Sequence, residues 1–153
     1  MENTPIPADP PGLLRRLAAL AYDAVLVFGL LLLGVTLIVV PLGALMGPGG
    51  TDTLGADPRL HGVLQAVMLL IVAGFPLWFW THGGQTLGMK TWRIRVVRED
   101  GGPLGWRDAL LRLAASWLSA GLLGLGFLWV LVDPQGRAWH DILSHTRLVM
   151  SPD

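Results

Sequence analysis

An acidic residue and a basic residue stand inside strongly apolar stretches of the chain. Asp23 lies within RRLAALAYDAVLVFGLLLLG, residues 15–34, and Arg112 lies near the start of a later apolar stretch. A carboxylate in a low-dielectric setting needs a partner or takes up a proton, and it can exchange that proton for a cation. These residue types therefore predict either ion and proton handling or a structural ion pair.

The partner of Asp23 decides between these two interpretations. Arg16 lies two helical turns earlier on the same face of an expected helix, but helical side chains lean toward the N-terminus, so Arg16 should reach toward lipid headgroups instead. Arg112, from another segment, is the candidate partner. Three alternatives stay open: a structural Asp23 paired with Arg112 or a backbone group, an ion- or proton-handling Asp23, and an Asp23 hydrated near the membrane surface.

The elements that must position these charges are apolar enough for a lipid bilayer. The chain of 153 residues is 52% hydrophobic and 14% charged, with a mean hydropathy of +0.55, whereas soluble domains carry about 25% charged residues. Segments 17–40, 63–80 and 109–132 are each long enough to cross a hydrocarbon core about 30 Å thick. The expected fold is an all-α, multi-pass membrane protein with a short cytoplasmic β element.

Basic residues concentrate on one side of these segments. Residues 1–11 read as a disordered tail ahead of a single transmembrane domain, residues 12–150. The loop 83–107 includes TWRIRVV, whose alternation predicts a strand. By the positive-inside rule, we expect the N-terminus and this loop on the cytoplasmic side of the inner membrane. The residues used are Arg15, Arg16, Lys90, Arg93, Arg95, Arg98 and Arg107 on that side, against Arg59 on the other.

Several classes of function are disfavoured. The formal net charge is zero, so we expect no nucleic-acid partner, and the absence of cysteine removes thiolate metal sites. His140, Asp141 and His145 are chemically suitable for zinc or manganese, but their spacing places the two histidines on different helix faces, so no metal site is expected. We expect neither a cofactor nor an enzyme.

The opening segment resembles the start of the RDD family of bacterial membrane proteins. In that family's pattern an arginine heads the first helix and is followed by a small residue and an aspartate, as Arg16, Ala19 and Asp23 are here. GQTLGMKTWRIRVV, residues 84–97, is similar to the central motif, and the closing motif resembles GFLWVLVDPQGRAWHDILSHTRLV. The resemblance makes Asp141 the second signature aspartate and covers residues 12–150.

The same resemblance implies transport, with cation/proton antiport as one form, around Arg16, Asp23 and Asp141. Whether these residues can meet depends on the third segment. A straight helix over 109–132 would place Asp133, His140 and Asp141 on the outer side. A break at the glycine cluster Gly121, Gly124 and Gly126 would return the C-terminal segment 134–150 to the side of Arg16, where TRLVM could pair with RIRVV. We expect the returning form.

The leading hypothesis is a transporter or cation/proton antiporter with Asp23 as the protonatable site, Asp141 as the second acid, and Arg16 and Arg112 as nearby charges. His140 and Asp133 are secondary candidates. The alternative is a non-catalytic membrane scaffold or partner-docking module in which the same charges are structural. Expected partners are membrane lipids, a monovalent cation or proton, and either further copies of the chain or a membrane partner protein, because so few helices can hardly enclose a pathway alone.

Overall fold

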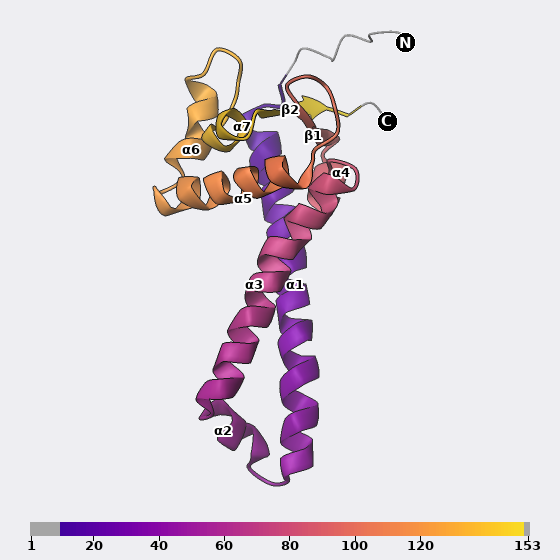
Figure 1. Cartoon of the computed structure of the whole chain (residues 1–153), viewed down its shortest axis with the longest axis vertical. Helices are drawn as coiled ribbons and strands as arrows, with labels where there is room; N and C mark the ends of the chain where they lie inside the picture. The colour runs from indigo at the N-terminus through magenta and orange to yellow at the C-terminus, as the bar shows by residue number, and fades with distance from the viewer. Residues whose placement is uncertain (1–9, 152–153) are drawn as a thin grey trace. The chain divides into compact units, whose positions relative to one another are not determined.

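The computed structural model describes residues 10–151, which are mainly helical and fall into two compact units (Figure 1). Unit 1 comprises the chain up to Asp23 together with the part from Pro76 onward, and unit 2 comprises Ala24–Phe75. The predicted N-terminal tail, residues 1–11, lies almost wholly outside the described residues.

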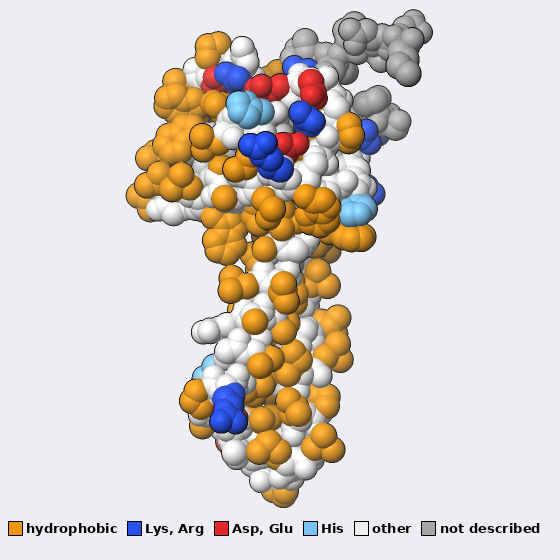
Figure 2. Space-filling model, viewed as in Figure 1, with side chains coloured by type: hydrophobic (Ala, Val, Ile, Leu, Met, Phe, Trp, Pro, Cys, Tyr) orange, Lys and Arg blue, Asp and Glu red, His pale blue; other side chains and the backbone are white. Residues whose placement is uncertain are grey.

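Unit 2 is built from the long apolar helices. Helix α1, Leu13–Met46, contributes its part after Asp23; the short α2, Gly50–Gly55, follows, and then α3, Pro58–Thr81, contributes its part up to Phe75. Both α1 and α3 are long and apolar enough to cross a membrane. Hydrophobic side chains are spread along the face of unit 2 that Figure 2 shows. The first two predicted segments are therefore confirmed as helices, each longer than predicted.

Unit 1 holds the short elements and the small sheet. It contains α4 (Leu87–Thr91), β1 (Ile94–Arg98), α5 (Trp106–Gly121), α6 (Leu125–Leu128), η1 (Trp129–Leu131), α7 (Trp139–Leu143) and β2 (Thr146–Met150). The strands pair antiparallel, with Val96 opposite Leu148. Their inward side chains form a core with residues of α1, α4 and the loop before α5: Ala19, Met89, Ile94, Val96, Leu104 and Leu148. The predicted pairing of RIRVV with TRLVM is confirmed.

The third apolar segment is broken. Helices α5 and α6–η1 meet at a bend of 107°, and Leu123 and Gly124 both adopt positive φ between them. The break falls inside the predicted glycine cluster. A single straight span over residues 109–132 is accordingly wrong, because β2 pairs with β1 and the chain must return to do so.

One local conformation occurs twice in unit 1. A glycine of positive φ, a five-residue helix, a residue of positive φ and a five-residue strand follow in the same order. The first copy uses Gly84 (φ 71°) and Arg93 (φ 53°), and the second uses Gly136 (φ 63°) and His145 (φ 51°). The first copy carries α4 and β1 and the second carries α7 and β2, so the sheet is the contact between two similar helix–strand units.

Candidate functional site

Asp141 is held between two arginines from different helices. Its carboxylate accepts a hydrogen bond from Nη1 of Arg16 at 2.7 Å and one from Nη1 of Arg112 at 2.6 Å. The side chain of Asp141 is fully buried, and those of Arg16 and Arg112 are 9% and 3% exposed. The clamp therefore joins α1, α5 and α7 through one carboxylate.

The backbone of the second helix–strand unit completes this clamp. The N–H of Ala138 donates to Asp141 at 2.9 Å and so caps α7. Arg16 donates also to the carbonyl of Gly136 at 2.7 Å and to that of Pro11 at 3.0 Å. These bonds use the fork geometry of a guanidinium, which presents several donors in fixed directions. Arg16 is thus bound within the protein. The prediction that it reaches toward lipid headgroups is wrong.

Arg112 connects the clamp to the sheet. Its Nη1 donates to the hydroxyl of Thr146 at 2.6 Å, and that hydroxyl lies 2.7 Å from the hydroxyl of Ser144. The guanidinium also lies over the ring of Trp80, 5.3 Å from the ring centroid, in a cation–π contact. The Arg112 charge, the second positive charge beside Asp141, is therefore also stabilised by the Trp80 ring and the Thr146 hydroxyl.

The electrostatics favour a permanently ionised carboxylate and a neutral histidine. Burial raises the pKa of Asp141, but the charges of Arg112 and Arg16 outweigh burial and hold the pKa well below its usual range. Burial and the Arg112 charge lower the pKa of His140 to about 3. His140 stacks at an angle on Phe127, with ring centroids 4.9 Å apart. It therefore behaves as a neutral core residue beside the clamp.

Asp23 has a separate set of partners. Its carboxylate accepts a hydrogen bond from the Thr86 hydroxyl at 2.5 Å and one from the Gly88 N–H at 2.8 Å. The predicted pair of Asp23 with Arg112 is wrong, since Arg112 binds Asp141 instead. Within residues 10–151 no ion pair joins Asp23 to a basic side chain. Asp23 thus fixes the first turn of α4 to α1.

Gly88 lets α4 approach α1 closely enough for this contact. A Cβ at Gly88 would collide with the carbonyl oxygen of Ala19 and with the Asp23 carboxylate. Thr86 also caps α4 by accepting from the Met89 N–H at 3.2 Å. The sequence interpretation missed Thr86, Gly88, Ser144 and Thr146. A threonine directly before a short helix, as in TLGMK, is an N-cap signal that could have pointed to Thr86 and to the helix that contains Gly88.

Asp133, the remaining candidate, lies outside the clamp, and so does Asp108, which was not a candidate. Asp133 accepts from the backbone N–H groups of Gln135 and Arg137 and pairs with the Arg137 side chain at 3.2 Å. Hydrogen bonds from the side chain and backbone of Arg137 lower the pKa of Asp133. Asp108 caps α5 by accepting from the Gly105 N–H at 3.2 Å. Both acids therefore stabilise turns and helix starts.

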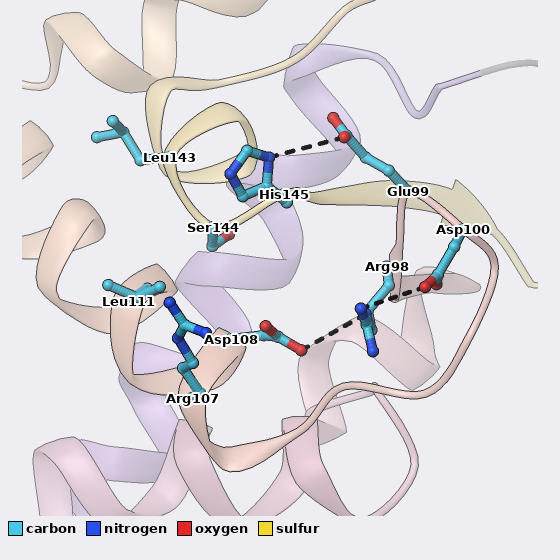
Figure 3. A pocket seen from close by; sticks show the side chains of 9 residues that line it. All are labelled: Arg98, Glu99, Asp100, Arg107, Asp108, Leu111, Leu143, Ser144 and His145. Carbon is cyan, nitrogen blue, oxygen red and sulfur yellow. Dashed lines mark ion pairs between the residues drawn. The ribbon is translucent and has the colours of Figure 1, made fainter.

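An open pocket of about 430 Å³ lies beside these charges (Figure 3). Arg98 pairs there with Asp100 at 3.2 Å and with Asp108 at 3.7 Å, and His145 lies 3.9 Å from Glu99. Acidic and basic groups both line the opening, and Arg98 lies between two of the acids (Figure 3). Within the described part of the chain, no group of three or more metal-ligating side chains forms a candidate metal site.

Taken together, the signature residues form two sites rather than one. Arg16 and Asp141 meet in the clamp with Arg112, whereas Asp23 binds α4. A model of the RDD family matches residues 10–145 of the chain. Comparison with curated proteins and with solved structures gave no significant match.

Proposed function

The chain belongs to the RDD family, and from that premise we propose that it is a non-catalytic membrane module in which the signature charges are structural. Helices α1 and α3 anchor the module in a bilayer. Unit 1 is the folded part that meets a partner. The observation that carries this proposal is the clamp on Asp141, which is buried, ionised and bound by two guanidinium groups and a backbone N–H.

A carboxylate bound in this way is poorly suited to carry a cation. Binding a cation would require both arginines to leave, and two buried guanidinium groups without a counter-charge would be strongly unfavourable. The same carboxylate connects three helices, and Arg112 extends the connection to β2 through Thr146. Its geometry therefore supports a role in assembly of unit 1.

The proposed docking face is the basic segment 83–107 on the cytoplasmic side of the inner membrane. Lys90, Arg93 and Arg95 lie on or next to α4 and β1, and the positive-inside rule assigns such segments to the cytoplasm. Anionic headgroups attract clustered basic residues near a membrane surface. Lipids, further copies of the chain or a membrane partner protein are the partners we propose for this face.

Cation/proton antiport is the second candidate, and Asp23 is the observation that favours it. Asp23 lies in a candidate membrane helix, and its described partners are a hydroxyl and a backbone N–H rather than a cation. A carboxylate held this way can be protonated without leaving an arginine unpaired. If transport occurs, Asp23 and not Asp141 should be the exchanging group.

Purified protein in liposomes distinguishes these two functions. Proton flux is measured under gradients of sodium, potassium and lithium for wild type, Asp23→Asn and the control Asp52→Asn, which removes an exposed acid of α2. The module predicts no flux above empty liposomes in any of the three. Flux in wild type and Asp52→Asn that is lost in a folded Asp23→Asn variant would establish antiport and refute the module.

A further inference from the structure

Residues 113–132 form an apolar elbow within unit 1. The elbow includes the end of α5, the turn at Leu123, and α6–η1, and it contains no Asp, Glu, Lys, Arg or His. Most of its large side chains are exposed, with Leu123 at 93% and Leu131 at 70%. Figure 2 shows hydrophobic side chains gathered over this end of unit 1. Such a surface needs an apolar partner.

Both ends of the elbow are fixed to the same body. Arg112, directly before it, is buried in the clamp with Asp141. Asp133, directly after it, pairs with Arg137 at 3.2 Å, and the chain then continues through α7 into β2, which pairs with β1. Both ends of the elbow therefore lie on the same side of any membrane that it enters.

The length of the elbow fits one leaflet. Residues 113–121 continue α5 for about 14 Å at 1.5 Å per residue. The hydrocarbon core of a bilayer is about 30 Å thick, so this arm is about half as long as the core is thick and too short to cross it. The bend of 107° then turns the chain back. A strongly apolar leucine of positive φ stands at the tip, as expected for a tip surrounded by acyl chains rather than water.

Several polar groups at the turn of the elbow are hydrogen-bonded within the elbow itself. At the turn, the N–H of Gly124 donates to the Ser119 carbonyl at 2.9 Å and that of Leu125 donates to the Leu122 carbonyl at 3.1 Å. The Ser119 hydroxyl donates to the Ala115 carbonyl at 2.9 Å. Irregular backbone enters hydrocarbon only where its polar groups are satisfied. These bonds satisfy part of the backbone at the bend.

Tryptophan placement gives an independent indication. All seven tryptophans of the chain lie between residues 78 and 139, within unit 1, and none lies in unit 2. Trp78, Trp106, Trp117 and Trp129 are between 40% and 57% exposed. Tryptophan is enriched where a membrane protein meets the headgroup region. Unit 1 therefore has the composition of an interfacial body, while unit 2 has that of a bilayer-spanning one.

We propose that the apolar elbow is a re-entrant element embedded in one leaflet, with lipid acyl chains as the partner of its exposed face. The inference does not depend on whether Asp23 and Asp141 have a structural role or a role in transport. A failure here would leave the proposed function standing, and the reverse is also true.

Single-cysteine variants test the proposal cleanly because the chain contains no cysteine. Leu123→Cys labels the tip. Leu143→Cys, on α7 and lining the open pocket, is the water-facing control, and Leu37→Cys, on α1, is the bilayer control; these side chains are 54% and 64% exposed. The full-length variants are reconstituted in vesicles, checked by thermal unfolding against wild type, and treated with a water-soluble maleimide. Nitroxide-labelled samples are then compared for collision with oxygen.

The elbow predicts that Leu123→Cys is labelled on the order of a hundredfold more slowly than Leu143→Cys, because the reactive thiolate would be an ion in hydrocarbon. Its nitroxide should collide with oxygen as often as that at Leu37. Fast labelling would overturn the proposal by showing a face in water. Slow labelling with few oxygen collisions would overturn it in favour of a second copy of the chain.

Sidedness gives the second readout. Gly102→Cys, before the elbow, and Gln135→Cys, after it, lie in exposed or partly exposed loops of unit 1. A membrane-impermeant maleimide should label both from the same side of oriented vesicles. Labelling from opposite sides would show a complete crossing and overturn the re-entrant form.

Discussion

The two helix–strand units of unit 1 share a backbone but use their carboxylates differently. In the first, Asp23 comes from outside, on α1, and binds the Thr86 hydroxyl and the Gly88 N–H of α4. In the second, Asp141 lies within α7, caps its own helix through Ala138, and draws in Arg16 and Arg112. Both carboxylates fix a five-residue helix that could not be stable alone.

This difference shows how a buried charge becomes expensive to remove. Loss of the Asp23 charge leaves behind a hydroxyl and an amide N–H, which are neutral. Loss of the Asp141 charge leaves two guanidinium groups buried without a counter-ion. The residue with charged partners should therefore dominate the stability of unit 1.

Asp141→Asn should have the largest effect. Removing one partner of a buried ion pair costs about 3–5 kcal/mol because the remaining charge is uncompensated. All seven tryptophans lie in unit 1, so denaturant unfolding followed by tryptophan fluorescence in nanodiscs reports on this unit. Unfolding at the wild-type denaturant concentration would contradict the clamp as the main support of α7.

Acid should come next, and it should act on the second helix–strand unit. The pKa of His140 is lowered from 6.5 to about 3 by burial, so the unfolded chain binds a proton between these values and the folded chain does not. The contribution of neutral His140 to the unfolding free energy is therefore fully present above about pH 6.5. It falls by about 2 kcal/mol when the pH is lowered to 5. Asp141, whose pKa is also lowered, adds to the loss below its unfolded value.

His140→Phe is the variant that isolates this contribution. Phenylalanine keeps a ring beside Phe127 and takes up no proton. The unfolding free energy of the variant should change less between pH 7 and pH 5 than that of wild type. An equal pH dependence in both proteins would assign the acid sensitivity to another group.

The matched glycines give a smaller contrast. Gly84 and Gly136 have φ of 71° and 63°, and alanine at either position costs about 1–3 kcal/mol in strain. A Cβ at Gly84 would also meet the Val96 carbonyl oxygen at 2.5 Å, whereas one at Gly136 would meet the Pro10 ring at 2.8 Å. Gly84→Ala should therefore lower the unfolding free energy more than Gly136→Ala. The reverse order would contradict the contact with the Val96 carbonyl as the cause of the difference.

Asp23→Asn should have the smallest effect. Asparagine retains a carbonyl oxygen to accept from Gly88, so only the bond with Thr86 is weakened, and the expected loss is about 1 kcal/mol. Hydrogen exchange of α4 measures it locally, with Asp52→Asn as the control. A loss as large as that of Asp141→Asn would remove the distinction between the two carboxylates.

Local pattern predicted the elements of the fold well. Apolar length identified α1 and α3, alternation identified β1, and the glycine cluster marked the bend between α5 and α6. The five-residue helices α4 and α7 were missed, because helices this short are set by tertiary capping rather than by periodicity. The return of the chain was predicted, since Asp141 and Arg16 could meet in no other way.

The partners of the charges were harder to predict. Arg112 was assigned to Asp23 but pairs with Asp141, because sequence shows which charges are in apolar segments and not which surfaces meet. Thr86 and Gly88, the true partners of Asp23, are neutral, so a search for opposite charges passes over them. Asp133, which sequence could not distinguish from a clamp residue, accepts from the backbone of a turn at the edge of unit 1.

A double-mutant cycle on Arg112 and Asp141 tests the central claim most directly. The unfolding free energy of unit 1 is measured for wild type, Arg112→Met, Asp141→Asn and the double variant. We predict a coupling free energy of about 2 kcal/mol or more. The double variant should therefore lose less unfolding free energy than the sum of the losses in the two single variants. A coupling near zero, together with a stable Asp141→Asn protein, would show that the clamp does not hold unit 1 together and that its carboxylate is free for another task.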